Sequence, residues 1–352
     1  MTHQSETLSA FGWSPFFSSQ CSPEDLIAFL PVRVMAVHRG QLSVAGPQLN
    51  TTIVPLRPVE GDEEASATVG DWLLIEPETL RPARLLDRKS LFKRRAPGTD
   101  YRLQLIAANV DTLFILSSCN QDFNIARLER YLALAGQAGV MPVVVLTKSD
   151  LAEDLSTFIT STARLMPGLL VEAIDARDGA SAGCLSPWCG DGQTVALVGS
   201  SGVGKSTLIN TLSGGDIATS EIRIDDDKGR HTTTGRALHR MGDGGWLIDT
   251  PGMRELQMVD MADGLDDVFS DLSELAAACR FSDCRHEGEP GCAVQGAIEA
   301  GEMSPDRLKR WQKLVREDSR NSESLMDRRA RDRAFGRMVK RAMNDKRRSR
   351  NV

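Results

Sequence analysis

The sequence lacks long apolar runs. No stretch approaches the roughly 20 apolar residues that a membrane-spanning helix requires, and the first residues show neither the basic start nor the apolar core of a secretory signal. The chain also has no internal repeat. We therefore expect a cytoplasmic protein without a membrane partner, and 352 residues with 41% hydrophobic content suffice for two or three domains.

Cysteine is scarce and odd in number. Seven cysteines without a secretory signal do not predict a disulfide framework, so metal binding or free thiols are preferred. Four soft ligands nevertheless share one short segment: Cys279, Cys284, His286 and Cys292. Three thiolates and one imidazole suit a closed tetrahedral site, so we expect one structural zinc ion. The alternative for this segment is buried thiols without a metal. Cys184 and Cys189 could form a separate metal pair, but no further ligands accompany them.

Positive charge is in deficit over the whole chain, whose net charge is −6. Taken alone, this argues against a nucleic-acid partner. The end of the chain differs, because residues 327–352 form an arginine-rich tail whose acidic residues are Asp327, Asp332 and Asp345. A basic arm on an acidic body is typical of proteins that bind a polyanion, and the alternative is a solvated charged helix.

The sequence pattern changes along the chain and predicts a multidomain protein. Residues 1–31 show no sustained period, and we expect a disordered extension. Residues 32–98 contain short β-rich runs between glycines, which favours a small OB-like barrel that contacts RNA, with an SH3-like barrel as the alternative. Residues 99–265 alternate apolar strands with amphipathic helices, as in a parallel α/β sheet. Helical patterns surround the cysteine cluster in residues 266–326.

Five strands are predicted in the α/β region, at 112–116, 143–146, 169–174, 194–198 and 246–248. Between the first two, apolar residues repeat at helical spacing and predict a core-facing helix. They are Ile125, Leu128, Tyr131, Leu132 and Leu134.

A phosphate-loop pattern follows the fourth predicted strand. It reads Gly199, Ser200, Ser201, Gly202, Val203, Gly204, Lys205, Ser206 and Thr207. The glycines let backbone N–H groups point at phosphate oxygens, Lys205 neutralises them, and the Ser206 hydroxyl ligates magnesium. The alternative is a plain glycine turn before a helix. Such a loop does not separate GTP from ATP.

Two further segments downstream fit the switches of a nucleotide hydrolase. Asp249 ends the fifth predicted strand and can hold magnesium through water, while the backbone N–H of Gly252 can sense the γ-phosphate. Between this turn and the phosphate loop lies the polar segment 229–234, from which we assign Thr233 to magnesium. Its neighbours Thr232 and Thr234 remain alternatives.

The segment that reads the base lies upstream. Residues Thr147, Lys148, Ser149 and Asp150 follow the second predicted strand and resemble the Asn-Lys-x-Asp loop of GTPases. In that loop the aspartate accepts hydrogen bonds from N1 and the exocyclic amine of guanine. Adenine presents no such donor pair, so Asp150 would select GTP. Ala176 stands where GTPases place an alanine whose N–H reaches the guanine oxygen.

The order of these segments is circularly permuted. The base loop and alanine loop precede the phosphate loop, whereas ordinary GTPases begin with the phosphate loop. A parallel sheet tolerates this reordering because domain termini often lie close together, so moving the ends preserves the site. The second switch then leads directly into the C-terminal region.

Together these motifs resemble the RsgA (YjeQ) family of circularly permuted bacterial GTPases that depend on the small ribosomal subunit. The similarity runs from about Val32 to Leu314 and includes residues 107–111. It implies an N-terminal OB barrel, a central α/β P-loop GTPase domain and a C-terminal zinc-binding domain. It also implies GTP hydrolysis stimulated by the small subunit during its late maturation, with ribosomal RNA, GTP and GDP as partners. We expect a monomer.

The resemblance also bears on catalysis. Met253 stands where Ras-like proteins carry the glutamine that orients water, so the resemblance points to the histidine of the His-Thr-Thr motif, here His231. His231 would act with Lys205 and Asp249, although a lone histidine also serves local structure.

Two other functions are compatible with the sequence. One is an RNA assembly scaffold that binds nucleotide and hydrolyses it incidentally. The other is a phosphate-loop ATPase or small-molecule kinase, which is disfavoured by Asp150 and by the lack of a lid-like second substrate site.

Overall fold

The computed structural model describes residues 7–56, 62, 64–95, 103–214, 236–249 and 261–322. In this part of the chain, no helix combines the length and the apolar character that crossing a membrane demands. The predicted switch segment 229–234, the turn 250–252 and the tail 327–352 lie outside the described residues, as does the side chain of Asp249.

The N-terminal segment is ordered from residue 7, so the predicted disordered extension is wrong for residues 7–31. The segment contains the 3-10 turn Leu8–Phe11 and two short helices, α1 (Pro15–Ser18) and α2 (Pro23–Ala28). Phe11 stacks on Trp246 with ring centroids 5.5 Å apart, and the Trp246 indole donates to the Ala10 carbonyl at 2.8 Å. Elements of one or two turns, anchored by single aromatic side chains, leave no sustained period in the sequence.

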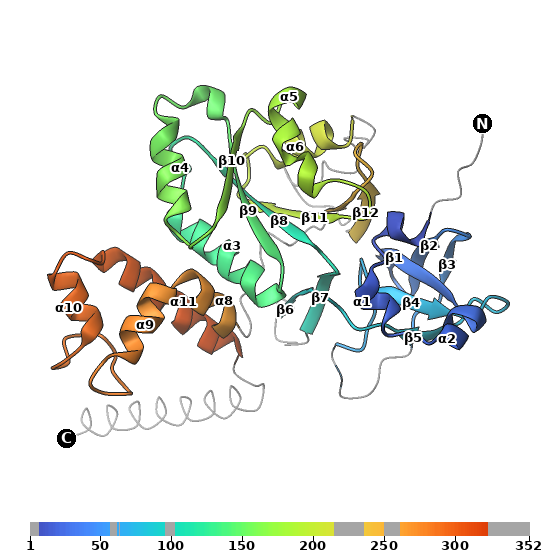
Figure 1. The fold of residues 1–352 in the computed structure, drawn as a ribbon, viewed down its shortest axis with the longest axis horizontal. Helices are drawn as coiled ribbons and strands as arrows, with labels where there is room; N and C mark the ends of the chain where they lie inside the picture. Colours follow the sequence, from blue (N-terminus) through green and yellow to red (C-terminus); the bar gives the residue numbers. More distant parts are fainter. Residues whose placement is uncertain are drawn as a thin grey trace, which may run out of the picture.

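Five antiparallel strands follow and form the N-terminal β region, labelled β1 to β5 in Figure 1. The long strand β1 pairs with both β2 and β4, which gives the order β3-β2-β1-β4-β5. A bulge between Val34 and Ala36 lets β1 bend from one pairing to the other. The strands are β1 (Leu30–His38), β2 (Gln41–Gly46), β3 (Leu49–Ile53), β4 (Trp72–Ile75) and β5 (Pro82–Leu85).

A small apolar core fills this β region. It consists of Val32, Val34, Leu42, Val44, Ile53, Leu73 and Ile75. Alternate residues of β1 and β2 point inward, as a half-buried strand requires. The β-rich runs expected in this region, at 32–37, 42–44 and 72–75, lie in β1, β2 and β4. Strands β3 and β5 were missed, because Asn50, Thr51 and Arg84 interrupt their apolar pattern.

The central α/β domain contains the parallel order β10-β9-β8-β11-β13, and all five strands predicted for it are confirmed. Helices lie on both faces of the sheet, so its central strands are buried throughout. On β8, Leu113 and Ile115 share the core of α3, whereas Phe114 and Leu116 share the core of α6. The bounds are β8 (Thr112–Ser118), α3 (Ile125–Ala138), β9 (Met141–Thr147), α4 (Leu155–Ala163), β10 (Leu170–Ile174), α5 (Gly179–Ala182), β11 (Thr194–Gly199), α6 (Lys205–Leu212) and β13 (Trp246–Asp249).

The β region and the α/β domain share one sheet. Strand β12 (Arg236–Arg240) pairs antiparallel with β13 on one side and with β1 on the other, where Ala36 faces Ala237. Eleven strands are thereby joined. A separate hairpin of β6 (Leu91–Arg95) and β7 (Leu103–Ala108) connects the two regions.

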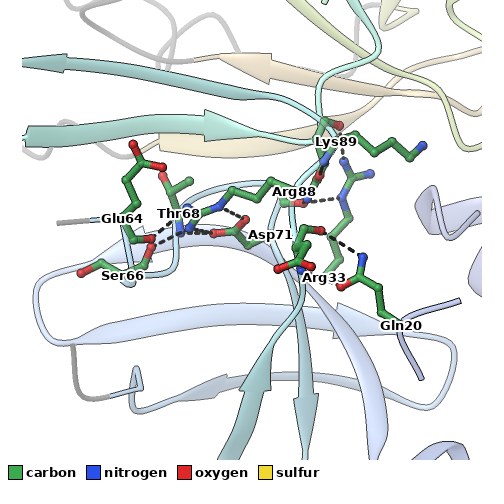
Figure 2. Close-up of polar contacts among 11 residues, drawn as sticks. Gln20, Arg33, Glu64, Ser66, Thr68, Asp71, Arg88 and Lys89 are labelled. Carbon is green, nitrogen blue, oxygen red and sulfur yellow. Dashed lines mark hydrogen bonds and ion pairs between the residues drawn. The ribbon is translucent and has the colours of Figure 1, made fainter. Parts of the chain in front are cut away.

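Arg33 of β1 is buried where the N-terminal segment, the β region and the α/β domain meet (Figure 2). Its guanidinium donates to the carbonyl of Phe11 at 2.6 Å and to the Thr194 hydroxyl, at the start of β11, at 2.8 Å. It also donates to the carbonyls of Gly70 and Asn109, at 3.4 and 3.3 Å. Burial lowers the pKa of Arg33 to about 10, while the charges of Asp111 and Asp71 raise it. Four chain segments therefore supply what this buried cation needs.

A buried ion pair lies beside Arg33. The side chain of Asp71 is inaccessible to solvent and accepts two hydrogen bonds from Arg88, each 2.8 Å long (Figure 2). Arg88 also donates to the carbonyls of Glu64 and Ser66, at 2.9 and 2.8 Å. Burial raises the pKa of Asp71, and the hydrogen bonds and charge of Arg88 act against that rise. The pair ties the loop before β4 to the segment that leads into β6.

The C-terminal helices pack on α3 of the α/β domain (Figure 1). A Cβ atom on Gly264 of α8 would clash with the Ala133 carbonyl, so glycine permits the close crossing of α8 and α3. The fully buried carboxylate of Glu129 on α3 accepts hydrogen bonds from Arg310 at 2.6 Å and from Arg307 at 3.3 Å, both on α11. The helices are α8 (Ala262–Val268), α9 (Ser270–Ala277), α10 (Ala293–Glu299) and α11 (Pro305–Ser322).

Candidate nucleotide site and metal centre

The predicted phosphate loop turns from β11 into α6 as the sequence requires. Gly202 and Gly204 have φ values of +72° and +98°, which are strained for residues with a Cβ atom. At Gly199 a Cβ atom would lie 2.7 Å from the Leu116 carbonyl. These glycines permit the tight passage, and α6 begins at Lys205, so its first N–H groups are available to an anion.

The amine of Lys205 lies inside this loop. Its Nζ donates to the carbonyls of Gly199 and Ser200, at 2.7 and 2.5 Å. Ser206 and Thr207 are exposed in the first turn of α6, where a hydroxyl can reach a bound magnesium ion. The loop therefore holds its cation close to the backbone groups that would bind phosphate.

The predicted base loop is tied to the phosphate loop by Thr147. This residue is fully buried at the end of β9, and its hydroxyl donates to the Val203 carbonyl at 2.6 Å. A Cβ atom on Gly204 would lie 3.9 Å from the Cβ atoms of both Thr147 and Ala176. Ala176 is fixed in turn, because its carbonyl accepts a hydrogen bond of 2.7 Å from Thr211 of α6. Three loops that are distant in sequence thus converge at the carboxyl edge of the sheet.

The remaining base-loop residues follow Thr147 and are half-buried or exposed. Lys148 adopts a left-handed conformation with φ of +57°, and the 3-10 turn Ser149–Leu151 follows it. Asp150 is exposed and accepts a hydrogen bond of 2.8 Å from Arg177. A carboxylate so placed is accessible to a base that enters over the phosphate loop.

The predicted switches are only partly within the described residues. Asp249 ends β13, which is parallel to β11, so its backbone lies at the same edge of the sheet as the phosphate loop. His231, Thr232, Thr233, Thr234 and Gly252 lie outside the described residues, as does Met253. Their roles stay predictions.

The four predicted metal ligands meet in the C-terminal region. Their ligand atoms all lie within 4.8 Å of one another: Cys279, Cys284, His286 and Cys292. The sulfurs of Cys279 and Cys292 are 3.9 Å apart, and Nδ1 of His286 lies 3.4 Å from the Cys292 sulfur. Tetrahedral zinc with bonds of about 2.3 Å to sulfur and about 2.05 Å to nitrogen needs edges of about 3.8 and 3.5 Å. The donor set therefore fits a zinc ion with no ligand position left open.

Comparison with known proteins decides the family. A profile of the RsgA GTPase family matches residues 85–259. Over 346 residues the chain is 46% identical to small ribosomal subunit biogenesis GTPase RsgA 2 of Vibrio parahaemolyticus, covering 97% of this chain and 94% of that protein. Over 328 residues it is 50% identical to RsgA of Mesorhizobium japonicum, covering 92% of this chain and 93% of that protein. The chain belongs to the RsgA GTPase family.

Solved structures agree with this RsgA-family fold. YjeQ from Thermotoga maritima superposes with a TM-score of 0.59 at 24% identity, over 82% of this chain and 98% of that one. YloQ, described as a circularly permuted GTPase, superposes with a TM-score of 0.57 at 23% identity, over 84% of this chain and 97% of that one. The multidomain fold class and the permuted order predicted for this RsgA GTPase are thereby confirmed.

Sequence reasoning missed two residues at this RsgA site. Arg177 contacts Asp150, and Thr211 fixes the alanine loop from α6. Arg177 directly follows the predicted alanine, and this position in the sequence could have indicated a cation near Asp150. Thr211 left none, because a threonine inside a helix pattern has no distinctive spacing.

Proposed function

We propose that this GTPase binds the small ribosomal subunit and acts in its late maturation, and that the subunit stimulates its hydrolysis of GTP to GDP and phosphate. The convergence of the phosphate loop, Thr147 and Ala176 around Gly204 carries the proposal. Two relatives of this length are named for small ribosomal subunit biogenesis. Ribosomal RNA is the polyanion that the OB-like barrel and the basic tail would contact.

In this proposal, Lys205 and the phosphate-loop N–H groups hold the phosphates, and Asp150 with Ala176 reads the base. Ser206, Thr233 and Asp249 would hold magnesium, which neutralises charge on the phosphates as the γ-phosphate leaves. The zinc ion would keep the C-terminal helices folded. Nucleotide state would then change the affinity for the subunit by ordering the switches.

Nucleotide-dependent binding to the subunit tests this function. We expect the protein to co-sediment with purified small subunits when a non-hydrolysable GTP analogue is present, and to be released with GDP. Lys205→Ala should abolish the nucleotide dependence, because it removes the phosphate-binding cation. Equal co-sedimentation with analogue, with GDP and without nucleotide would favour the scaffold alternative instead.

The base loop has its own test. Replacing Asp150 with Asn reverses the hydrogen-bonding character of one group, so we expect preference to shift from guanosine toward xanthosine nucleotides. Direct competition against a fluorescent guanine nucleotide measures the shift, and ATP serves as the adenine control. Unchanged affinity for GTP in the Asp150→Asn variant would refute the assignment.

A further inference from the structure

Arg177 lies across the base loop. Its Nη2 donates to Oδ2 of Asp150 at 2.8 Å and to Oδ2 of Asp175 at 2.9 Å. Its Nε donates to Oδ1 of Asp175 at 3.0 Å. One guanidinium thus joins the carboxylate that would read guanine to a second carboxylate on the alanine loop.

Asp175 determines where Arg177 lies. Besides its two bonds to the guanidinium, Asp175 accepts a hydrogen bond of 3.0 Å from the backbone N–H of Arg177. Hydrogen bonding from the Arg177 side chain lowers the pKa of Asp175, so this carboxylate stays charged at neutral pH. Asp175 therefore keeps the guanidinium near Asp150 whether or not Asp150 is engaged.

The ion pair between Arg177 and Asp150 is weak. The side chain of Arg177 is 67% exposed, and exposed ion pairs contribute little because water screens them. A guanidinium that leaves Asp150 keeps its bonds to Asp175 and remains solvated. A base can therefore displace Arg177 from Asp150 at small cost.

Guanine needs the oxygen that Arg177 occupies. Its N1–H and its 2-amino group donate side by side, so recognition by Asp150 engages both carboxylate oxygens. Hypoxanthine has the N1–H but lacks the 2-amino group, so it engages one oxygen and leaves the other to Arg177. A carboxylate has about four lone-pair sites, so in the first case Arg177 must share Oδ2 with a donor of the base, whereas in the second case it can keep one oxygen to itself.

We propose that Arg177 is a specificity-determining residue that covers Asp150 in the nucleotide-free protein and competes with the 2-amino group of guanine. The proposal rests on the base-loop assignment made above. Arg177 reduces discrimination between guanine and hypoxanthine nucleotides, because it supplies a hydrogen bond to Asp150 when the 2-amino group is missing. Guanine must compete with it for the oxygen that it holds, and hypoxanthine need not.

The affinity ratio of guanosine diphosphate to inosine diphosphate tests this role. Both ligands carry the same phosphates, so a general electrostatic effect of removing a cation cancels in the ratio. For Arg177→Ala we expect the ratio to rise roughly two- to fivefold over the wild type, the range that an exposed ion pair supports. Arg177→Lys keeps the charge without the fork and should give an intermediate ratio. Arg164→Ala removes another exposed arginine, at the end of α4, and should leave the ratio unchanged.

An unchanged or smaller ratio in Arg177→Ala overturns the proposal. The Asp150→Asn variant separates this failure from failure of the base loop. If Asp150→Asn gains affinity for xanthosine diphosphate while Arg177→Ala leaves the ratio unchanged, the base loop stands and Arg177 plays no part in specificity. If Asp150→Asn gains none, the base-loop assignment fails, and the proposal for Arg177 fails with it.

Discussion

The α/β domain is attached to its two neighbours in different ways. The β junction, with the N-terminal β region, consists of the β1–β12 pairing, the buried side chains of Arg33 and Asp71, and the half-buried Arg88. The helical junction consists of α8 and α11 packed on α3, with Glu129 as its buried carboxylate. Main-chain hydrogen bonds between strands fix the first around the buried Arg33 and Asp71, whereas helix packing around one buried carboxylate fixes the second.

In the proposed function, the two junctions differ in how closely they connect to the predicted switch segment. Strand β12 begins at Arg236, two residues after the end of the predicted switch segment 229–234, and it pairs with β1 of the N-terminal β region through Arg236 and Ala237. A rearrangement of that segment would act on β12, which belongs to the same sheet as the N-terminal β region. The helical junction reaches the α/β domain through α3, between the strands β8 and β9, and β9 leads to the base loop. In the proposed function, the N-terminal β region is therefore connected more directly than the C-terminal helices to the segment that would sense the γ-phosphate.

Removing the metal should have the largest effect, and that effect should be confined to the C-terminal helices. Structural zinc contributes roughly 10 kcal/mol or more to folding at neutral pH, because the ligands form no site in the unfolded chain. We expect a strong chelator, or Cys292→Ala, to abolish hydrogen-exchange protection in α9 and α10 while β1 and β4 stay protected. Metal analysis should find one zinc per chain. Cys184→Ser, at an exposed thiol, is the control. Full protection of α9 and α10 after chelation would contradict a structural zinc.

Breaking the Asp71–Arg88 pair of the β junction should have the next largest effect on stability. Asp71→Asn removes a neighbouring negative charge from Arg88, whose side chain is 11% exposed, and from the fully buried Arg33, so we expect unfolding free energy to fall by about 3–5 kcal/mol in urea titrations. Asp191→Asn is the matched control, because Asp191 pairs with Arg240 at 3.2 Å but is 76% exposed. That control should cost less than about 1 kcal/mol. Similar losses in the two variants would show that burial does not distinguish them.

Breaking the helical junction should cost less. Glu129→Gln removes a buried charge, but Arg307 keeps its pair with Asp271, 2.8 Å away, and Arg310 is 26% exposed, so water can solvate it. We expect a loss of about 2 kcal/mol in thermal or urea unfolding. Glu317→Gln, whose bidentate partner Arg130 lies 2.7 Å away with both side chains half-buried, should cost less than Glu129→Gln because its own carboxylate is 30% exposed. A larger loss from Glu129→Gln than from Asp71→Asn would reverse the comparison.

Sequence reasoning predicted those parts of the fold that depend on local pattern. The strands that begin at Thr112 and Thr194 are continuous apolar runs, and the phosphate loop follows the second of them. The four metal ligands were readable because they lie close together in sequence. In each case the pattern and the structure share one short segment.

The junctions could not be predicted, because their partners lie far apart in sequence. Arg33 is a charged residue within a strand pattern, and its partners Phe11, Asn109 and Thr194 come from three other segments. The ordered N-terminal segment was missed for the same reason, since Phe11 is buried by contact with the distant Trp246. Long-range polar contacts leave no periodic signal.

The central claim is that this GTPase acts as a switch coupled to the small ribosomal subunit. The most direct measurement is the GTP hydrolysis rate of the full chain, with and without purified small subunits, at one nucleotide concentration. We predict slow turnover by the protein alone and a marked acceleration by subunits, which Lys205→Ala abolishes. Equal rates with and without subunits would contradict the coupling.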